Sequence, residues 1–170
     1  MKTSCLITAV AIAALSSAAR AAPAPAGSCE VAAAKTVGEV QADLSRLAVE
    51  AVNRAAASGH DGDARLQQLV MPMASFSLGG GDVGRPLGGG VTGLHIMVRE
   101  MKADTFRFLG WDYIPTPVAD PCGQQKVEVE FIDTRGRNVF PVKFTFQGAR
   151  IVSAEGWSRS FVTGPISPVR

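Results

Sequence analysis

Asp112 is the residue in this sequence best suited to acid–base chemistry, because it lies between two large aromatic residues, Trp111 and Tyr113. A carboxyl group that enters a dry pocket loses its hydration, and its pKa then rises towards neutrality. Such a group can act as a general base or acid near neutral pH. Glu155, in a later apolar segment, is the second candidate. The competing interpretation places both acids at the surface of strands.

Nucleophilic catalysis has little support in the sequence. The chain has two histidines and no G-x-S-x-G segment of the kind that presents a serine nucleophile. His60 lies in a polar, turn-like stretch. His95 is predicted to share a helical face with Arg99 and Lys102, and therefore to point to water.

A metal centre is not predicted either. Zinc sites in proteins take four nitrogen, sulfur or oxygen ligands, whereas the histidines here are far apart and the cysteines are predicted to pair. Met71 and Met73 are soft ligands of the kind that suits Cu(I), as are Met97 and Met101. The latter two fall on an apolar helix face, however, where methionine usually fills a core. We therefore predict no metal and no cofactor.

A glycine-rich stretch, LGGGDVGRPLGGGVTG from Leu78 to Gly93, fits the pattern G-x-G-x-x-G twice. A dinucleotide site needs a strand that runs into the glycines and a helix that leaves them. A helix follows the second match, and Asp112 comes about 20 residues later. Only Arg85-Pro86-Leu87 precedes that match, however, and no β-α-β unit recurs. We predict a mobile loop that permits positive φ and can cover a cavity mouth.

The N-terminus has the layout of a secretory signal peptide. A short positive start is followed by an apolar run from Cys5 to Leu15 and by the A-x-A site Ala19-Arg20-Ala21. The run is shorter than the roughly 20 residues that span a membrane as a helix. We predict removal of residues 1–21, a flexible lead-in over residues 22–35, and a periplasmic or secreted protein.

Removal of the signal peptide changes the charge of the chain. Lys2 and Arg20 leave and no acid leaves, so the 17 basic residues become 15 against 15 acidic ones. A neutral chain without a cluster of Lys and Arg gives no electrostatic basis for binding nucleic acid or anionic lipid. The remaining length suits one domain with a single core.

Two cysteines, Cys29 and Cys122, remain after Cys5 is removed with the signal peptide. In an oxidising compartment a pair of cysteines favours one disulfide. Closing a loop of about 90 residues stabilises a fold by roughly 4 kcal/mol in the chain-entropy model. The alternative makes Cys29 the lipidated first residue of a lipoprotein, but the preceding Ala26-Gly27-Ser28 lacks the leucine expected there.

Helices are predicted in the first half of the chain. Thr36 and Glu39 form a capping box, and apolar residues then recur at spacings of three and four. Gly59 stops this helix, and Asp63 can cap a short second one. The predicted helices cover residues 36–57, 64–70 and 92–103.

The second half alternates with period two, which is typical of strands, and its short connections favour antiparallel pairing. Pro141 cannot donate to a ladder, so its strand is predicted to be bulged or at an edge. Glu128 and Glu130 alternate with apolar residues and are predicted to face solvent, while Asp133 is predicted to cap a turn. FRFLGWDY is apolar on both faces, which indicates either ordinary packing on both sides or an outer face covered by a homodimer partner or the C-terminal tail. The predicted strands cover residues 74–78, 106–113, 126–133, 139–146 and 149–157.

This order of elements resembles the nuclear transport factor 2-like superfamily, which includes ketosteroid isomerase-like and polyketide cyclase-like proteins. LQQLVMPMASFSLGGG is similar to its helix-to-strand segment, with Met73 where many members have an acid. VFPVKFTFQGARIVSAEGW is similar to its closing hairpin, with Gly148 in the turn. The resemblance implies an α+β fold, in which N-terminal helices pack on a curved antiparallel sheet to form a cone with a pocket. The domain would span residues 36–162, before a tail at residues 163–170.

The resemblance does not select a function, because this fold carries many unrelated activities. We expect an exported protein that binds a small apolar or amphipathic molecule in a pocket lined by aromatic residues of the sheet. The alternatives are an isomerase- or cyclase-like enzyme that uses Asp112 or Glu155, and a non-catalytic dimerisation module. The expected lining residues are Trp111, Tyr113, Phe144 and Trp157.

Overall fold

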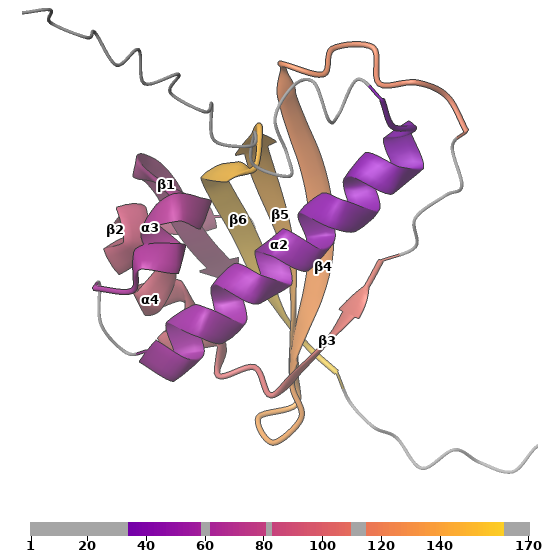
Figure 1. The fold of residues 1–170 in the computed structure, drawn as a ribbon. Helices are drawn as coiled ribbons and strands as arrows, with labels where there is room; N and C mark the ends of the chain where they lie inside the picture. The colour runs from indigo at the N-terminus through magenta and orange to yellow at the C-terminus, as the bar shows by residue number, and fades with distance from the viewer. Residues whose placement is uncertain (1–33, 59–61, 81–82, 110–114, 162–170) are drawn as a thin grey trace, which may run out of the picture.

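The structure, a computed structural model, describes residues 34–58, 62–80, 83–109 and 115–161. The helices pack on a six-stranded sheet and share a single hydrophobic core with it (Figure 1). The signal peptide, Cys29, Trp111, Asp112, Tyr113 and the tail predicted above lie outside the described residues. In chain order the elements are α2 (Val37–Ser58), α3 (Ala64–Leu69), β1 (Val70–Gly80), β2 (Val83–Gly89), α4 (Gly90–Met101), β3 (Thr105–Phe108), β4 (Gln124–Asp133), β5 (Asn138–Gln147) and β6 (Arg150–Ser160).

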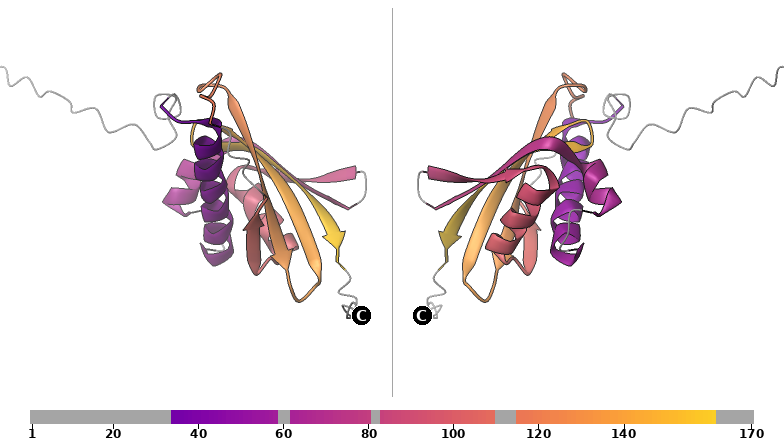
Figure 2. Two further views of the ribbon diagram at one scale, coloured as in Figure 1. Left: turned by 90° about the vertical axis from the view of Figure 1, so that its right-hand side faces the viewer. Right: turned by 90° about the vertical axis from the view of Figure 1, so that its left-hand side faces the viewer.

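The strands lie in the order β2-β1-β6-β5-β4-β3. Neighbours pair antiparallel except β1 and β6, which pair parallel. The sheet is curved and the helices cover one of its faces (Figure 2). The predicted α+β class is therefore confirmed, with a mixed sheet in place of a purely antiparallel one. The parallel pair was not predicted because β1 and β6 are distant in sequence.

Helix α2 begins with the predicted capping box. The backbone N–H of Thr36 donates to Glu39 Oε2 at 2.9 Å, and the N–H of Glu39 donates to Thr36 Oγ1 at 3.4 Å. These hydrogen bonds favour the charged carboxylate and lower the pKa of Glu39. The buried face of α2 includes Val40, Leu44, Ala48, Ala51, Val52 and Ala55.

Helix α3 is tied to α2 by side chains. Asp63 caps α3, since its Oδ1 accepts from the N–H groups of Arg65 and Leu66 at 2.8 and 3.1 Å. The guanidinium of Arg65 then donates both Nε and Nη2 to Glu50 of α2, at 2.8 and 3.1 Å. This two-bond pairing is geometrically specific and lowers the pKa of Glu50. The predicted cap of the second helix is confirmed.

The prediction of a mobile glycine loop is wrong. Residues 83–89 form strand β2, which pairs antiparallel with β1 from Ser75↔Gly89 to Gly80↔Val83. Positive φ is nevertheless needed at Gly88 (φ 122°) and at Gly90 (φ 59°), where β2 turns into α4. A strand therefore does run into the second glycine match. Strand β2 was not predicted because its glycine-rich sequence, VGRPLGG, does not alternate between apolar and polar residues.

Glycines 90 and 93 permit close packing of α4 against the sheet. A Cβ at Gly93 would lie 2.6 Å from the carbonyl oxygen of Gly88 and 2.9 Å from the ring of Phe76. A Cβ at Gly90 would lie 2.9 Å from the carbonyl oxygen of Pro72. Both separations are shorter than van der Waals contact, so only glycine lets the helix begin there.

Two strand predictions require correction. Pro141 lies in β5, which is a central strand and not an edge. The β5–β6 ladder has partners at Val139 and Val142 but none at Phe140 or Pro141 within the described strands, so the missing N–H falls at an interruption of the ladder. Glu130 was predicted to face solvent, yet it is only 7% exposed and pairs with Arg107 of the neighbouring β3 at 2.5 Å.

The turn between β4 and β5 agrees with the prediction. Asp133 Oδ1 accepts the N–H of Gly136 at 2.7 Å. The β5–β6 turn also has glycine at the predicted position, because Gly148 adopts φ 60°. Short turns of this kind set the antiparallel register of the last three strands.

Phenylalanine rings form the centre of the core between the sheet and the helices. Phe131 and Phe144 meet edge to face at 6.2 Å, and Phe144 and Phe146 lie 6.4 Å apart. Phe76 of β1 and Met97 of α4 are buried with them. Among the described helices, none is both long and apolar enough to cross a membrane.

We expect Gly93→Ala to destabilise the fold by about 1–3 kcal/mol, since the added methyl group overlaps backbone atoms that cannot move away easily. Gly84→Ala is the matched control on β2, because its nearest contact would be Ser77 Oγ at 3.7 Å. The control should be neutral or more stable by up to about 1 kcal/mol. Urea unfolding measures both. Equal stability of the two variants would contradict close packing at Gly93.

Candidate functional site

Phe144 and Trp157, the two predicted ligand-binding residues that the structure describes, do not lie together. Phe144 is fully buried in the core. Gly156 faces the same interior, since a Cβ there would meet Leu78 and Val142. Trp157, the next residue along β6, consequently faces the opposite side of the sheet. Phe144 and Trp157 therefore cannot contact the same ligand from these positions, and the lining roles of Trp111 and Tyr113 stay predictions.

Glu155, the second candidate acid, also lies on the outer face. It is exposed and pairs across the β5–β6 ladder with Lys143. Its neighbour Ala154 pairs with Phe144 and faces the core. Glu155 is thus in the solvated environment that the competing interpretation described.

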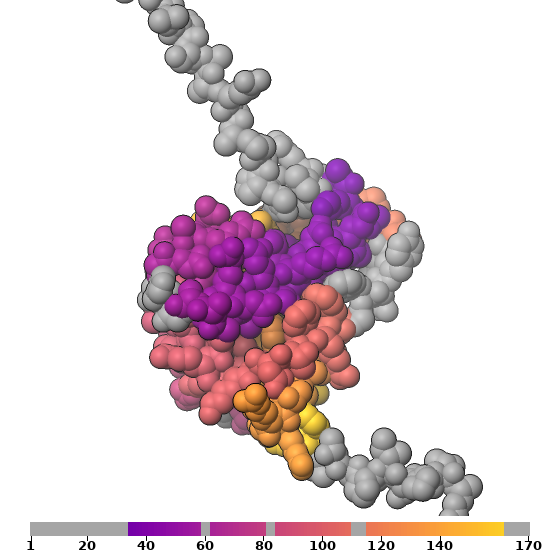
Figure 3. All heavy atoms as spheres, turned by 60° about the horizontal axis from the view of Figure 1, so that its bottom comes forward, coloured from indigo at the N-terminus to yellow at the C-terminus, as the bar shows by residue number. Residues whose placement is uncertain are grey.

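Two hollows that could hold a ligand lie beside the helices. One, of about 410 Å³, lies between the C-terminal half of α2 and α4. A second, of about 230 Å³, continues past α4 to β3. Ala56, Val98 and Ala103 line both, so the two hollows adjoin, and we call them together the α2–α4 groove. Figure 3 shows α2 beside α4 and β3 on this side of the molecule. The first hollow is also lined by Ala55, Thr92, His95, Arg99 and Lys102, and the second by Val52, Asn53, Met101, Asp104, Thr105, Phe106 and Phe131.

Small side chains on α2 leave room for the groove. Ala55 and Ala56 lie in the last two turns of α2 and present small side chains to the first hollow. The wall towards β3 combines Met101 and the partly exposed ring of Phe106 with the polar Asp104 and Thr105. Phe106 packs edge to face on Phe108 at 5.4 Å, which orients the ring. The groove therefore offers apolar surface to a ligand from α2 and from β3.

His95 joins the two helices at the floor of the groove. The prediction that it points to water is wrong, because His95 is only 7% exposed and its Nδ1 lies 3.0 Å from the carbonyl oxygen of Ala55. A carbonyl oxygen can only accept, so Nδ1 carries the proton of this bond. The helical-face argument failed because α2 packs over that face of α4.

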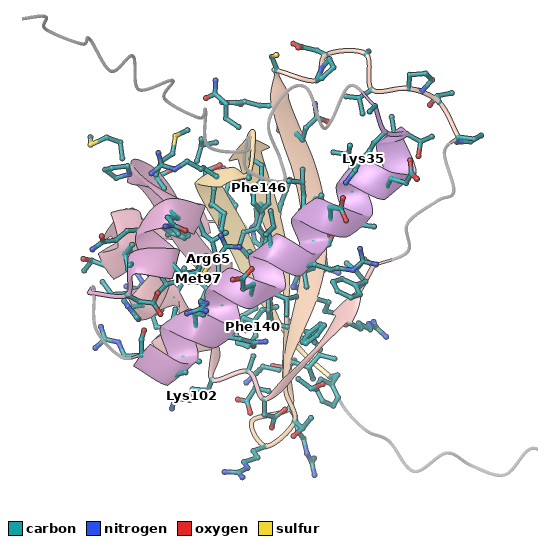
Figure 4. All side chains as sticks on the ribbon, viewed as in Figure 1. Lys35, Arg65, Met97, Lys102, Phe140 and Phe146 are labelled. Carbon is teal, nitrogen blue, oxygen red and sulfur yellow. The ribbon has the colours of Figure 1, made fainter. Side chains whose placement is uncertain are left out.

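Two cations line the groove without an acidic partner. Arg99 and Lys102 are exposed, and no ion pair or hydrogen bond engages their side chains within the described residues. The neighbouring Glu100 is paired with Arg85 instead. The first hollow thus presents unneutralised positive charge, with Lys102 below the C-terminal end of α2 in Figure 4.

Asp104 brings a negative charge to the β3 side of the groove. Its carboxylate accepts from Thr134 Oγ1 at 2.6 Å and from the Thr134 N–H at 3.3 Å. These hydrogen bonds lower the pKa of Asp104, so the group is ionised at neutral pH. The two ends of the groove consequently carry opposite charge.

Lys102 has an unusual backbone conformation for its residue type. It ends α4 in the left-handed region, at φ 49° and ψ 26°, while its N–H donates to the Val98 carbonyl at 3.1 Å. Helices commonly end this way on glycine, because other L-residues are strained there. A charged side chain is held at the groove despite that strain.

Metal binding finds no geometric support in this part of the chain. No group of three or more His, Cys, Asp or Glu residues gathers in ligand geometry within the described ranges. Met73 is almost fully exposed at the surface of β1, whereas Met97 and Met101 are buried core residues. The apolar helix face on which the latter two were predicted is therefore confirmed.

Comparisons with known proteins found matches among solved structures. No family model matches the chain, and no curated protein matches it. Solved structures do. An NTF-2-like protein of unknown function from Silicibacter pomeroyi DSS-3 is 17% identical, covers 69% of this chain and 92% of its own, and has a TM-score of 0.43. A de novo designed NTF2-fold protein is 12% identical over 69% of this chain and 85% of its own, with a TM-score of 0.43.

A phenazine biosynthesis-related protein from Pseudomonas aeruginosa is 14% identical, covers 78% of this chain and 98% of its own, and has a TM-score of 0.35. At these identities the likeness concerns the fold alone. It assigns no activity to this chain.

The left-handed conformation of Lys102 should reverse the usual effect of alanine and glycine substitutions on stability. We expect Lys102→Gly to be more stable than Lys102→Ala by about 1 kcal/mol, since only alanine keeps the left-handed strain. At Arg99, which lies within the same helix, we expect Arg99→Ala to be more stable than Arg99→Gly by about 1 kcal/mol, because alanine favours a helix interior over glycine. Thermal and urea unfolding of the four variants measure this, and the same order at both positions would contradict it.

Proposed function

We propose that this protein is an exported binding protein for a small amphipathic molecule, which it holds in the α2–α4 groove. The observation that supports this proposal is the pair of adjoining hollows beside α2, of about 410 and 230 Å³. Small-molecule sites are commonly clefts of about 300–1,000 Å³ with mostly apolar walls and a few polar groups. The groove has this size, and its lining combines apolar side chains such as Val98 and Met101 with polar and charged ones.

The sequence analysis expected the ligand to contact aromatic residues of the sheet inside the cone. The proposal places it instead in the groove between α2, α4 and β3. Phe144 and Phe146 of β5 are fully buried core residues. The groove still receives aromatic surface, from Phe106 and the edge of Phe131. The ligand would therefore contact β3 and the two helices.

Catalysis is not part of the proposal. A general base or acid works best with a pKa near the operating pH. The carboxylate that lines the groove, Asp104, has a lowered pKa. Glu155 lies on the other face of the sheet. An ionised acid at the groove wall suits recognition of a ligand better than proton transfer.

Filling the groove should abolish binding. Ala56 lines both hollows and is exposed, so Ala56→Phe can place a ring in the groove without entering the core. We expect its Kd for the neutral fluorescent probe N-phenyl-1-naphthylamine to rise at least about tenfold, which corresponds to a loss of roughly 1.4 kcal/mol. Fluorescence titration measures the Kd.

Ala57→Phe is the matched control, because Ala57 is exposed on the same helix and does not line the groove. It should bind the probe like the unaltered protein. If the two variants bind with the same Kd, the ligand does not occupy the α2–α4 groove.

Export and the disulfide form the second part of the proposal. Cys122 lies in the exposed turn before β4, and Cys29 lies outside the described residues, so the Cys29–Cys122 bridge stays a prediction. Expression of the full chain in a bacterium should yield a periplasmic protein that begins at Ala22. Its intact mass should rise on reduction by the hydrogen gained at both thiols. A cytoplasmic, uncleaved chain would contradict export, and a mass unchanged by reductant would contradict the bridge.

A homodimer through the outer face of the sheet stays an expectation from the sequence. Native mass spectrometry of the same periplasmic protein reports the number of copies together with any molecule that co-purifies. A dimer would leave the proposed binding site unchanged, because the groove lies on the helical side of the sheet.

A further inference from the structure

We propose that the α2–α4 groove selects amphipathic anions, and that Arg99 and Lys102 bind the acid group of the ligand. This inference rests on the proposed binding function and specifies the chemical class of the ligand. The acid group is a carboxylate, sulfonate or phosphate joined to an apolar body. The evidence comes from charge, backbone strain and the shape of the groove.

The two cations lie close together in the sequence and have no acidic partner. Arg99 lies in the last turn of α4, Lys102 is its C-cap, and both line the same hollow. No carboxylate pairs with either side chain among the described residues. Every other arginine in the described helices pairs with an acid on its own or a neighbouring element, as Arg46, Arg54 and Arg65 do. A bound anion would neutralise both charges together.

The dipole of α4 does not by itself explain Lys102. A helix C-terminus carries partial negative charge, so a basic residue in the last turn is favourable, and Arg99 already supplies one. Lys102 follows in the left-handed conformation, at φ 49°, where glycine would relieve the strain. The strain therefore accompanies a second cation that lines the same hollow as Arg99, and two cations in one hollow suit the binding of an acid group.

The charges also set the direction of the ligand. The cations border the hollow between α2 and α4, whereas Asp104 lines the hollow towards β3 and is held ionised by Thr134. Repulsion from Asp104 disfavours an anion on the β3 side. The acid group would accordingly lie at Arg99 and Lys102, and the apolar body would cross Ala56 and Val98 to reach Phe106.

A pair of closely related probes tests this assignment. 8-Anilinonaphthalene-1-sulfonate is N-phenyl-1-naphthylamine with an added sulfonate, so the two differ in charge and little else. On the mature, oxidised protein we expect the sulfonate to bind tighter than the neutral probe. The variants are Arg99→Ala and Lys102→Gly, with Arg159→Ala, an exposed arginine on β6, as the control.

We expect each groove variant to weaken sulfonate binding by about five- to tenfold, as the loss of one charge-assisted contact does. Binding of the neutral probe should stay within about twofold, a change of roughly 0.4 kcal/mol. Raising the salt concentration should weaken only the sulfonate, because screening acts on charge. Arg159→Ala should leave both probes unaffected.

The outcomes separate the two proposals. If the neutral probe binds and Ala56→Phe blocks it, but the sulfonate is insensitive to Arg99 and Lys102, the groove binds ligands without selecting anions and the inference is overturned. If Arg159→Ala weakens the sulfonate as much as the groove variants do, the effect is general attraction and the inference is likewise overturned. If neither probe binds the unaltered protein, the proposed function itself fails.

Discussion

The approach of α4 to the first two strands is the constraint on which the rest of this structure depends. Gly93 lies against the backbone of Gly88 and the ring of Phe76, and Gly90 lies against Pro72. No side chain fits at either contact, so the helix axis is brought close to the sheet. Helix α4 in turn carries Met97 and Met101 into the core and His95 to the carbonyl of α2. The glycines of the motif that first suggested phosphate binding thus act by being small, and they fix where the next turns of the helix place their charges.

Between the helices and the described strands, the side chains of β4 and β5 form a buried core. The phenylalanines of β4 and β5 pack on one another and on Phe76, which makes the inner face of the sheet a core surface. Free space is then found where the helices end, beyond the alanines at residues 55 and 56, and it opens beside α4. The site is therefore formed by helix ends and a short edge strand, elements whose side chains can differ without disturbing the core.

Local signals in the sequence predicted the local parts of the fold. The Thr36–Glu39 box, the Asp63 cap and the turn at Gly148 depend on neighbours along the chain, and each is present. Interactions between distant segments were not predictable in the same way. The parallel partner of β1 lies about half the chain away, the burial of Glu130 depends on Arg107 of another strand, and the burial of His95 depends on α2. The groove was missed for the same reason, although two basic residues at one helix end and paired alanines at another were visible. Nothing in one sequence says that those ends meet.

The parallel pairing of β1 with β6 has a consequence for the order in which the molecule can be assembled. β1 and β2 reach the remaining strands only through β6, which is the last strand of the chain. Until Arg150–Ser160 has left the ribosome, the hairpin of β1 and β2 has no strand with which to pair. The part of the sheet on which α4 packs is then incomplete. Contacts between segments so far apart in sequence close late and slowly. A nascent chain with this topology therefore cannot complete its sheet before β6 has been synthesised.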